Sequence, residues 1–204
     1  GNRAVLNLPN VARGEDIDVL RRIVSECRLE NFIANNLYAF ELCRGKNVLA
    51  GFMLNSMNGK LRREKIVSPE IGRFDNNSVN YVFGKLPLMT FCHCAKKNLT
   101  ANGCAVCNGY DDASLKDGFG NEFPLRRYKI KHCYTSLLNS LPVFLTDKAN
   151  ENKTEKKFID FTGYSPKEIS DIAECVINGT KPLFDYTRGY YNKNKMLANY
   201  DGAI

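Results

Sequence analysis

Cysteines and histidines, the residues best suited to bind metals, gather in one stretch of this chain, from Phe91 to Cys133. Five of the eight cysteines and both histidines lie within it. Four of the thiols follow the spacing Cys94-x9-Cys104-x2-Cys107-x25-Cys133. Because thiolates are the preferred ligands of zinc and of iron-sulfur clusters, this spacing predicts one metal site with four thiolate ligands.

The Cys104-x2-Cys107 pair is the most specific part of the pattern, because two intervening residues let a tight turn aim both sulfurs at one metal ion. An Asn-Gly dipeptide on each side supplies residues that tolerate positive φ. The same pair serves zinc and a 4Fe-4S cluster, so the spacing leaves both cofactors open. Cys92 lies two residues before Cys94 and would share its face of a strand, so it remains an alternative ligand.

Proteolytic chemistry finds little support in the residues. A serine or cysteine protease needs a base beside its nucleophile, and the only histidines, His93 and His132, are each adjacent to a predicted metal ligand. The chain contains neither an H-E-x-x-H motif nor a G-x-S-x-G motif. An acidic site built from Glu70 with Asp111 or Asp112 remains open, although acids on loops are usually surface charges.

The composition, 44% hydrophobic and 25% charged residues with a net charge of +7, describes a globular protein. No 18-residue apolar run occurs, so we expect no spanning helix and no membrane partner. Five cysteines cluster in one stretch, and the other three lie in helix-like patterns as small residues. We therefore expect a reduced, cytoplasmic protein with a metal site rather than an oxidised protein with disulfides. Because the sequence starts at Gly1 rather than Met, it resembles a fragment, and a missing targeting signal is uninformative.

Three basic clusters, the first of them Lys60, Arg62, Arg63 and Lys65, suit a polyanion. Arg126 and Arg127 belong to one cluster, and Arg188 with Tyr190 joins positive charge to an aromatic face in the C-terminal tail. Because such residues hold phosphate and stack on bases, RNA is a candidate partner. The alternative interpretation is that the clusters are the solvated surface of a basic protein and that the tail packs its tyrosines on the core.

The elements that must position these residues alternate between strands and helices. Helices are predicted to begin at Asp16 and Leu37. The predicted strands are residues 4–8, 32–34, 48–54, 66–68, 79–83 and 86–91. Strands that are apolar on both faces are typical of parallel sheets covered by helices, and these are too few to close an eight-stranded barrel. We therefore expect half a barrel, completed by missing sequence or a partner, or a small open sheet.

Two candidate catalytic residues, Asn55 and Glu70, follow predicted strands, where barrel folds carry their active-site loops. Further along, a hairpin is predicted around Asp117-Gly-Phe-Gly-Asn121, with strands at 141–145 and 158–161 and a polar loop at 148–157. Ser165 begins a helix with a capping box, and Gly179 ends it.

Several motifs occur in an order that resembles the peptidase U32 family, the collagenase-like proteases. They are F-G-K-L-P-L-M-T-F-C-H-C (83–94), the central C-x-x-C, L-K-D (115–117) with Gly120, F-P-L (123–125), Cys133, N-S-L-P (139–142) and Y-T-R-G (186–189), with G-F-M-L-N (51–55) and S-P-E (68–70) upstream. The resemblance covers nearly the whole chain and corresponds to the C-terminal part of the family domain. The chain departs from the family pattern at Ala95, Gly118 and Tyr190.

Two activities are attached to this family. The traditional one is peptidase, and other members act in oxygen-independent hydroxylation of transfer RNA, ribosomal RNA or the ubiquinone ring and hold a 4Fe-4S cluster on four cysteines. The resemblance therefore implies that Cys94, Cys104, Cys107 and Cys133 hold such a cluster in a protein that supports RNA hydroxylation. A U32 peptidase and a non-catalytic module stapled by zinc remain the alternatives.

The predicted architecture is α/β with three regions. Residues 1–91 form a partial TIM-barrel-like parallel α/β unit, residues 92–140 a Cys-rich metal-binding module, and residues 141–204 a small α+β extension. The rest of the U32 domain or a partner subunit would complete the barrel.

Overall fold

The computed structural model describes residues 4–54, 64–94, 97 and 113–191. The elements in chain order are β1 (Leu6–Asn7), α1 (Gly14–Glu26), β2 (Asn31–Ala34), α2 (Leu37–Leu42), β3 (Asn47–Ala50), the 3-10 helix η1 (Phe52–Leu54), β4 (Ile66–Val67), the 3-10 helix η2 (Pro69–Ile71), β5 (Val79–Gly84), β6 (Pro87–Phe91), β7 (Ala113–Lys116), β8 (Glu122–Lys129), β9 (Cys133–Leu138), β10 (Val143–Phe144), α4 (Thr146–Glu151), β11 (Lys157–Ile159) and α5 (Pro166–Asn178).

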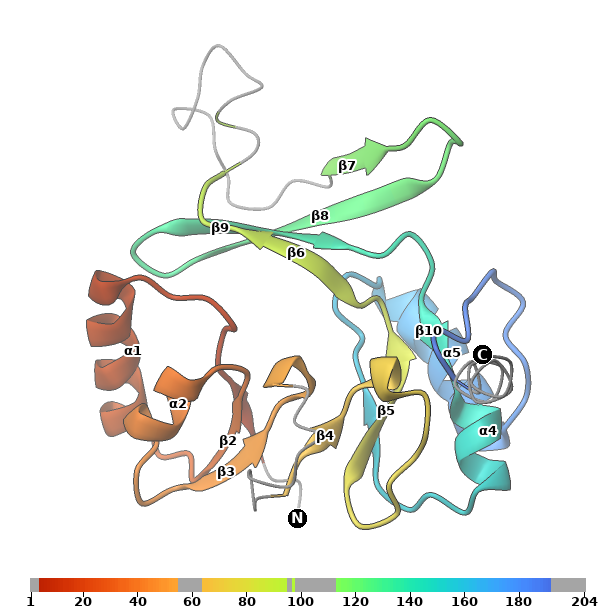
Figure 1. The fold of residues 1–204 in the computed structure, drawn as a ribbon, viewed down its shortest axis with the longest axis horizontal. Helices are drawn as coiled ribbons and strands as arrows, with labels where there is room; N and C mark the ends of the chain where they lie inside the picture. Colours follow the sequence, from red (N-terminus) through yellow and green to blue (C-terminus); the bar gives the residue numbers. More distant parts are fainter. Residues whose placement is uncertain (1–3, 55–63, 95–96, 98–112, 192–204) are drawn as a thin grey trace, which may run out of the picture.

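A succession of parallel strands forms the base of the molecule (Figure 1). The first three strands pair in chain order, and a parallel bridge between Ala50 and Lys65 leads from β3 toward β4. In the second sheet β4 and β11 both run parallel to β5, on opposite sides of it. The predicted α/β class with parallel strands is confirmed, and no closed barrel is found among the described residues.

Sheet C is a four-stranded antiparallel sheet with the order β6-β9-β8-β7 (Figure 1). It contains the predicted hairpin, whose strands are β7 and β8. The expectation that residues 86–91 continue the parallel series is wrong, since β6 pairs with β9 in this sheet. Gly84, at φ 137, ends β5 where a Cβ atom would come within 2.8 Å of the Asp160 carbonyl oxygen, so only glycine fits at this turn away from the parallel strands.

Helices cover the parallel strands on the outside. Leu20 and Val24 of α1 pack with Phe32 of β2 in one buried cluster, and Ile172 of α5 packs with Phe83 and other aromatic rings in another. The predicted capping box of α5 is confirmed: the Ser165 N–H donates to the Glu168 carboxylate at 2.7 Å and the Ser165 hydroxyl accepts from the Glu168 N–H at 3.4 Å. Each terminus of α5 is therefore set by local sequence, as Gly179 closes it at φ 67.

Two further predictions about the elements were partly wrong. The polar segment 148–157 was predicted as a loop, but its first residues belong to α4, where Thr146 and Ala149 are buried. A six-residue helix with two inward positions shows no apolar periodicity, so its sequence resembles a loop. Strand β3 stops at Ala50, and a 3-10 helix follows where the strand was expected to continue to residue 54.

The predicted boundaries at residues 92 and 141 are both crossed by strand pairing. Strand β6 pairs with β9, and β10 and β11 both pair with β5. The described parts of the three predicted regions are therefore joined through shared sheets. The division of the chain at residues 92 and 141 stays a prediction. No helix of the described residues is both long and apolar enough to cross a lipid bilayer.

A buried carboxylate joins α1 to sheet C. Asp16 is fully buried and accepts hydrogen bonds from the backbone N–H groups of Lys131 at 2.7 Å and His132 at 2.9 Å, in the turn between β8 and β9. The hydroxyl of Tyr134 and the N–H of Arg13 donate to its second oxygen. Burial raises the pKa of Asp16, but these hydrogen bonds outweigh it and hold the pKa well below its usual value.

We predict that Asp16→Asn destabilises the protein by about 2 to 4 kcal/mol, because the amide offers its own donors to groups that are already donors. A depressed carboxylate pKa adds stability that is fully present above the unfolded-state value of about 4 and is lost as the pH falls below it. The stability of the variant should therefore fall less steeply with acid than that of the wild type. Urea unfolding between about pH 3 and pH 7 measures both effects.

The matched control is Asp18→Asn, two residues further along on the exposed side of α1, where Asp18 pairs with Arg21 in solvent. This change should alter stability by less than about 0.5 kcal/mol. Equal effects of the two substitutions would contradict an anchoring role for Asp16.

Candidate functional site

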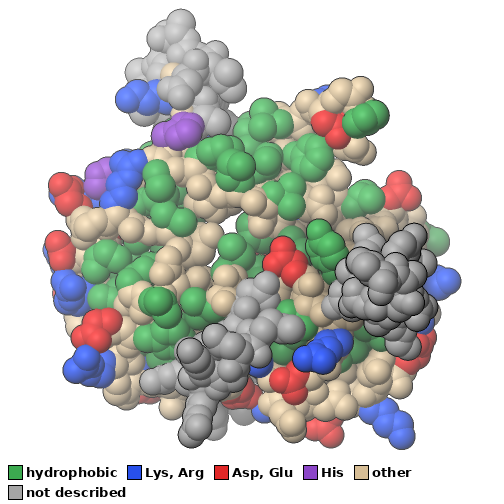
Figure 2. Space-filling model, viewed as in Figure 1, with side chains coloured by type: hydrophobic (Ala, Val, Ile, Leu, Met, Phe, Trp, Pro, Cys, Tyr) green, Lys and Arg blue, Asp and Glu red, His purple; other side chains and the backbone are tan. Residues whose placement is uncertain are grey.

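A cleft of about 690 Å³ lies between the carboxyl ends of the parallel strands and sheet C, and Figure 2 shows the hollow between these two layers. Ligands of open parallel sheets bind at the carboxyl ends of the strands, and this volume suits a small molecule or one unit of a polymer. The strand ends contribute Asn7 (the last residue of β1), Leu8 (after β1), Asn35 (after β2), Phe52 (after β3), Lys85 (after β5) and Asp160 (after β11). Sheet C contributes Arg126, Arg127, Tyr128, Ser136 and Leu138.

The Asn35 carboxamide is fixed at one end of the cleft. Its Nδ2 donates to Asn7 Oδ1 at 2.6 Å and to the Leu8 carbonyl at 2.8 Å. Behind it the chain passes so close that a Cβ atom on Gly51 would lie 2.0 Å from Asn35 Oδ1. The residue directly after β3 must therefore be glycine, because a larger side chain there would occupy the space of the Asn35 amide.

Positive charge collects at the other end of the cleft. The half-buried Lys85 follows β5, and burial together with the nearby Arg126 lowers the pKa of its ammonium group. The Arg126 guanidinium lies against Gly163, to whose carbonyl its Nη2 donates at 2.8 Å. Gly163 has a φ of 89, and a Cβ atom there would come within 2.4 Å of this guanidinium.

The two described thiols of the predicted metal site lie at one end of sheet C. Cys94 follows β6 and Cys133 begins β9, and because Phe91 pairs with Thr135 in antiparallel register, both cysteines fall at the same end of these neighbouring strands. Arg127 Nη1 donates to the Cys94 sulfur at 3.6 Å. Cys104 and Cys107 lie outside the described residues, and among the described residues no three potential ligands gather around one point.

Both histidines take part in contacts that build the protein. His132 Nδ1 lies 3.2 Å from Asp16, and the backbone carbonyl of His93 accepts a hydrogen bond from the Thr135 hydroxyl. Of the two catalytic candidates, Glu70 is exposed in η2 and does not line the cleft, and Asn55 lies outside the described residues. A catalytic role for either of these two stays a prediction.

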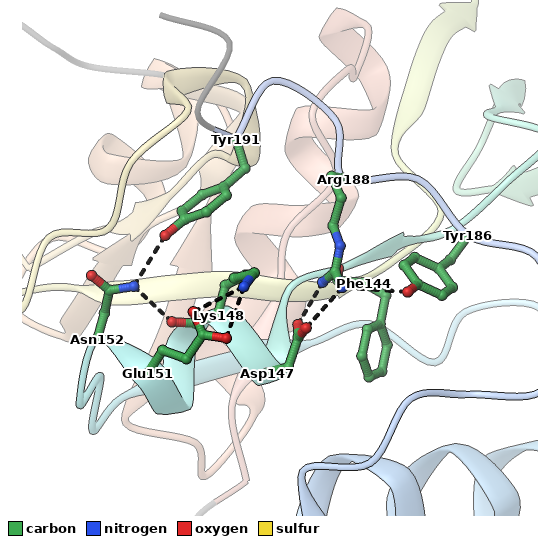
Figure 3. Close-up of polar contacts among 8 residues, drawn as sticks. All are labelled: Phe144, Asp147, Lys148, Glu151, Asn152, Tyr186, Arg188 and Tyr191. Atoms are coloured by element: carbon green, nitrogen blue, oxygen red, sulfur yellow. Dashed lines mark hydrogen bonds and ion pairs between the residues drawn. The ribbon is translucent and has the colours of Figure 1, made fainter. Parts of the chain in front are cut away.

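Of the predicted nucleic-acid contacts, Arg126 and Arg127 line the cleft, whereas Arg188 lies elsewhere (Figure 3). The Arg188 guanidinium donates to both carboxylate oxygens of Asp147, to the Phe144 carbonyl at 2.7 Å and to the Tyr186 hydroxyl at 3.3 Å. Burial raises the pKa of Asp147, but the hydrogen bonds from Arg188 and from the backbone N–H of Lys148, together with the charges of both side chains, outweigh it and leave the pKa below its usual value. Tyr190 is about half exposed next to this cluster.

Neither Lys85 nor Asn35 is among the site residues predicted from the sequence. Both residues come directly after a strand, so the carboxyl-end rule was the one signal that could have found them. The fold and the site together define an α/β protein with a polar, positively charged cleft over its parallel strands. Comparison with protein-family models, with curated proteins and with solved structures found no match to the chain.

We predict that Gly163→Ala displaces the Arg126 guanidinium and destabilises the protein by about 1 kcal/mol or more, since alanine is strained at this positive φ. A crystal structure of the variant and its urea unfolding curve measure these effects. Gly118→Ala is the control, because no atom lies within 4 Å of a Cβ placed there. An unmoved Arg126 in the variant would refute this packing.

We also predict a coupling of about 1 to 3 kcal/mol between Arg188 and Asp147 in a double-mutant cycle of Arg188→Gln and Asp147→Asn, because the pair is bidentate and mostly shielded from water. The exposed Lys148 and Glu151 pair, also shown in Figure 3, should give no more than about 0.5 kcal/mol. Urea unfolding of the four proteins in each cycle measures both couplings, and similar values would show that Arg188 has no special structural role.

Proposed function

We propose that this chain is an iron-sulfur protein of the U32 type that supports oxygen-independent hydroxylation of RNA. The observation that carries the proposal is that the strand pairing of sheet C brings Cys94 and Cys133 to one end of the sheet that covers the cleft. Sheet C would then hold both the metal site and one wall of the binding cleft.

The described residues fit a thiolate-bound cluster. Two of the four proposed ligands, Cys94 and Cys133, lie at the same end of the neighbouring strands β6 and β9. The guanidinium of Arg127 lies against the Cys94 sulfur, where its positive charge favours the thiolate form. Arg127 also lines the cleft, so one side chain connects the proposed ligand to the proposed substrate site. When bound, a 4Fe-4S cluster supplies one-electron chemistry, while the substrate is bound and oriented by this chain's own residues.

RNA is proposed as the substrate because of the charges in the cleft. Among the described residues, its lining carries three cationic side chains, Lys85, Arg126 and Arg127, against one carboxylate, Asp160. Apolar residues such as Leu8, Phe52 and Leu138 line other parts of the cleft and suit a flat, partly apolar base. A peptide substrate would require a nucleophile with a base, and neither histidine of the chain faces such a group in the described residues.

We further propose that the parallel strands belong to a barrel whose remaining strands come from the rest of a U32 domain or from a partner subunit. The succession ends at β1, which pairs through only two residues and, in the described part of the chain, has no neighbour on its second side. An edge of this kind accepts further strands readily. A cytoplasmic location accords with thiols that must remain reduced.

The proposal predicts about four irons and four acid-labile sulfides per chain after purification without oxygen, with a broad brown absorbance. Cys94→Ser and Cys133→Ser should each remove most of the bound iron, because serine replaces a soft thiolate ligand. Iron, sulfide and zinc analysis of each variant measures this result.

Cys175→Ser on α5 is the matched control and should keep its iron. Loss of iron in Cys92→Ser with retention in Cys94→Ser would move the first ligand to Cys92. One zinc per chain with no iron would overturn the proposal and leave the cysteine module as a structural zinc site.

A further inference from the structure

We propose that the amine of Lys85 is a nucleophile that forms an imine with a small aldehyde or ketone bound in the cleft. This inference goes beyond the proposed function, because the reaction uses neither the metal site nor RNA. It assigns a covalent chemistry to one lysine of the cleft lining and leaves the other lining residues to bind and orient the carbonyl compound.

Lys85 lies where parallel sheets carry their reactive groups. It follows β5, which has the parallel strands β4 and β11 on its two sides, and it lines the cleft. Ligands of such sheets bind at the carboxyl ends of the strands. A carbonyl compound that enters the cleft therefore meets the half-buried Lys85.

The main chain is fixed on both sides of Lys85. Gly84, directly before it, pairs with Val143 of β10. Directly after it, the Leu86 carbonyl accepts a hydrogen bond from the Asn139 N–H at 2.8 Å. The lysine side chain thus starts from a rigid support, which a nucleophile needs if it is to meet a carbonyl carbon at a defined place.

The ammonium group of Lys85 has no anionic partner among the described residues, where no carboxylate oxygen lies within 4 Å of it. The two acids that act on it from further away are held by other groups. Glu168 accepts the N–H of Ser165 at 2.7 Å, and Glu122 accepts the hydroxyl of Ser114. A half-buried lysine that only supports the fold is usually paired, so an unpaired one in a cleft is a candidate for chemistry.

The surroundings of Lys85 favour the uncharged amine, which is the form that attacks a carbonyl group. Burial, and after it the charge of Arg126, lower the pKa of Lys85, and the opposing influence of the two glutamates is weaker. Asp160, an acid of the cleft lining, accepts the N–H of Thr162 at 2.9 Å and is held in the turn after β11. A lysine that is partly desolvated and close to another cation is activated as a nucleophile.

The step needs neither an oxidant nor a reductant. The nitrogen lone pair of Lys85 attacks the carbonyl carbon, a C–N bond forms, and a proton moves from nitrogen to the carbonyl oxygen through water. The resulting hydroxyl group takes one proton from solvent and leaves as water while the nitrogen lone pair forms the C=N bond. The nitrogen then returns one proton to solvent, so one amine and one carbonyl group give one imine and one water.

A neutral carbonyl compound suits this part of the cleft. The charged groups that act on Lys85 are one guanidinium and two carboxylates, so an anionic ligand gains no net attraction from them. Asp160 and Thr162 add polar groups to the lining, and Pro87 and Leu138, which pair across β6 and β9, add apolar surface. A small hydroxylated aldehyde such as glyceraldehyde matches both kinds of surface.

The test is reductive trapping of the full chain, purified without oxygen, with glyceraldehyde and sodium cyanoborohydride at neutral pH, followed by peptide mass spectrometry. We expect Lys85 to be labelled about tenfold faster than Lys116, an exposed lysine of β7 outside the cleft, because the cleft holds the carbonyl group beside an uncharged amine. Labelling of Lys85 should also reach half of its maximal rate at a lower pH than labelling of Lys116. Lys85→Arg keeps the positive charge and should remove the fast adduct from the intact protein.

Formaldehyde is the reference reagent, because it reports an accessible, uncharged amine and is too small to need the cleft. Fast labelling of Lys85 by formaldehyde but not by glyceraldehyde would overturn the carbonyl site, and so would equal rates at Lys85 and Lys116. A larger ratio of Lys85 to Lys116 labelling with glyoxylate, an anionic aldehyde, would overturn the choice of a neutral ligand. Urea unfolding verifies that Lys85→Arg is folded.

The iron measurement and the trapping experiment are independent of each other. Protein that contains the cluster but shows no selective labelling of Lys85 would refute the imine site and leave the iron-sulfur proposal standing. Protein that is labelled selectively at Lys85 but contains no iron would support the imine site and refute the proposed redox chemistry.

Discussion

The buried carboxylate of Asp16 is the contact on which the arrangement of the site depends. It lies in the first turn of α1 and accepts the N–H groups of the turn between β8 and β9, about 115 residues further along the chain. Sheet C therefore cannot shift relative to α1 without leaving a buried charge without its hydrogen bonds, which is among the costliest defects in a protein interior. The cleft and the end of sheet C that carries Cys94 and Cys133 are both positioned by this contact.

Close backbone approach is the second constraint. At Gly51 and Gly163 the missing side chain leaves the space that a polar cleft residue occupies, the Asn35 amide in one case and the Arg126 guanidinium in the other. Each glycine lies behind its polar residue and limits where that group can move. The polar groups at the two ends of the cleft are thus held by backbone contacts in addition to hydrogen bonds, an arrangement that reduces the entropy such groups lose when a ligand binds.

Local signals predicted much of the fold but little of the cleft. The capping box at Ser165, the Asp117 hairpin and the apolar parallel strands were readable because each depends on a few neighbouring residues. Strand β9 was not predicted, and β6 was assigned to the wrong sheet, because both are defined by pairing with distant segments. Asp16 was recognised as the start of a helix, but nothing near it in sequence reveals the turn that it binds.

The distribution of charge shows why counting basic residues does not locate a binding surface. Arg188 and Arg126 look alike in sequence, yet Arg188 is neutralised by a bidentate Asp147 and fixed against Phe144, whereas the guanidinium of Arg126 donates to the Gly163 carbonyl and lines the cleft. A paired guanidinium adds little to the attraction of an anion, because its field is cancelled at short range. The charge of Arg188 is therefore largely cancelled within the fold, whereas Lys85 and Arg126 line the cleft at the carboxyl ends of the parallel strands.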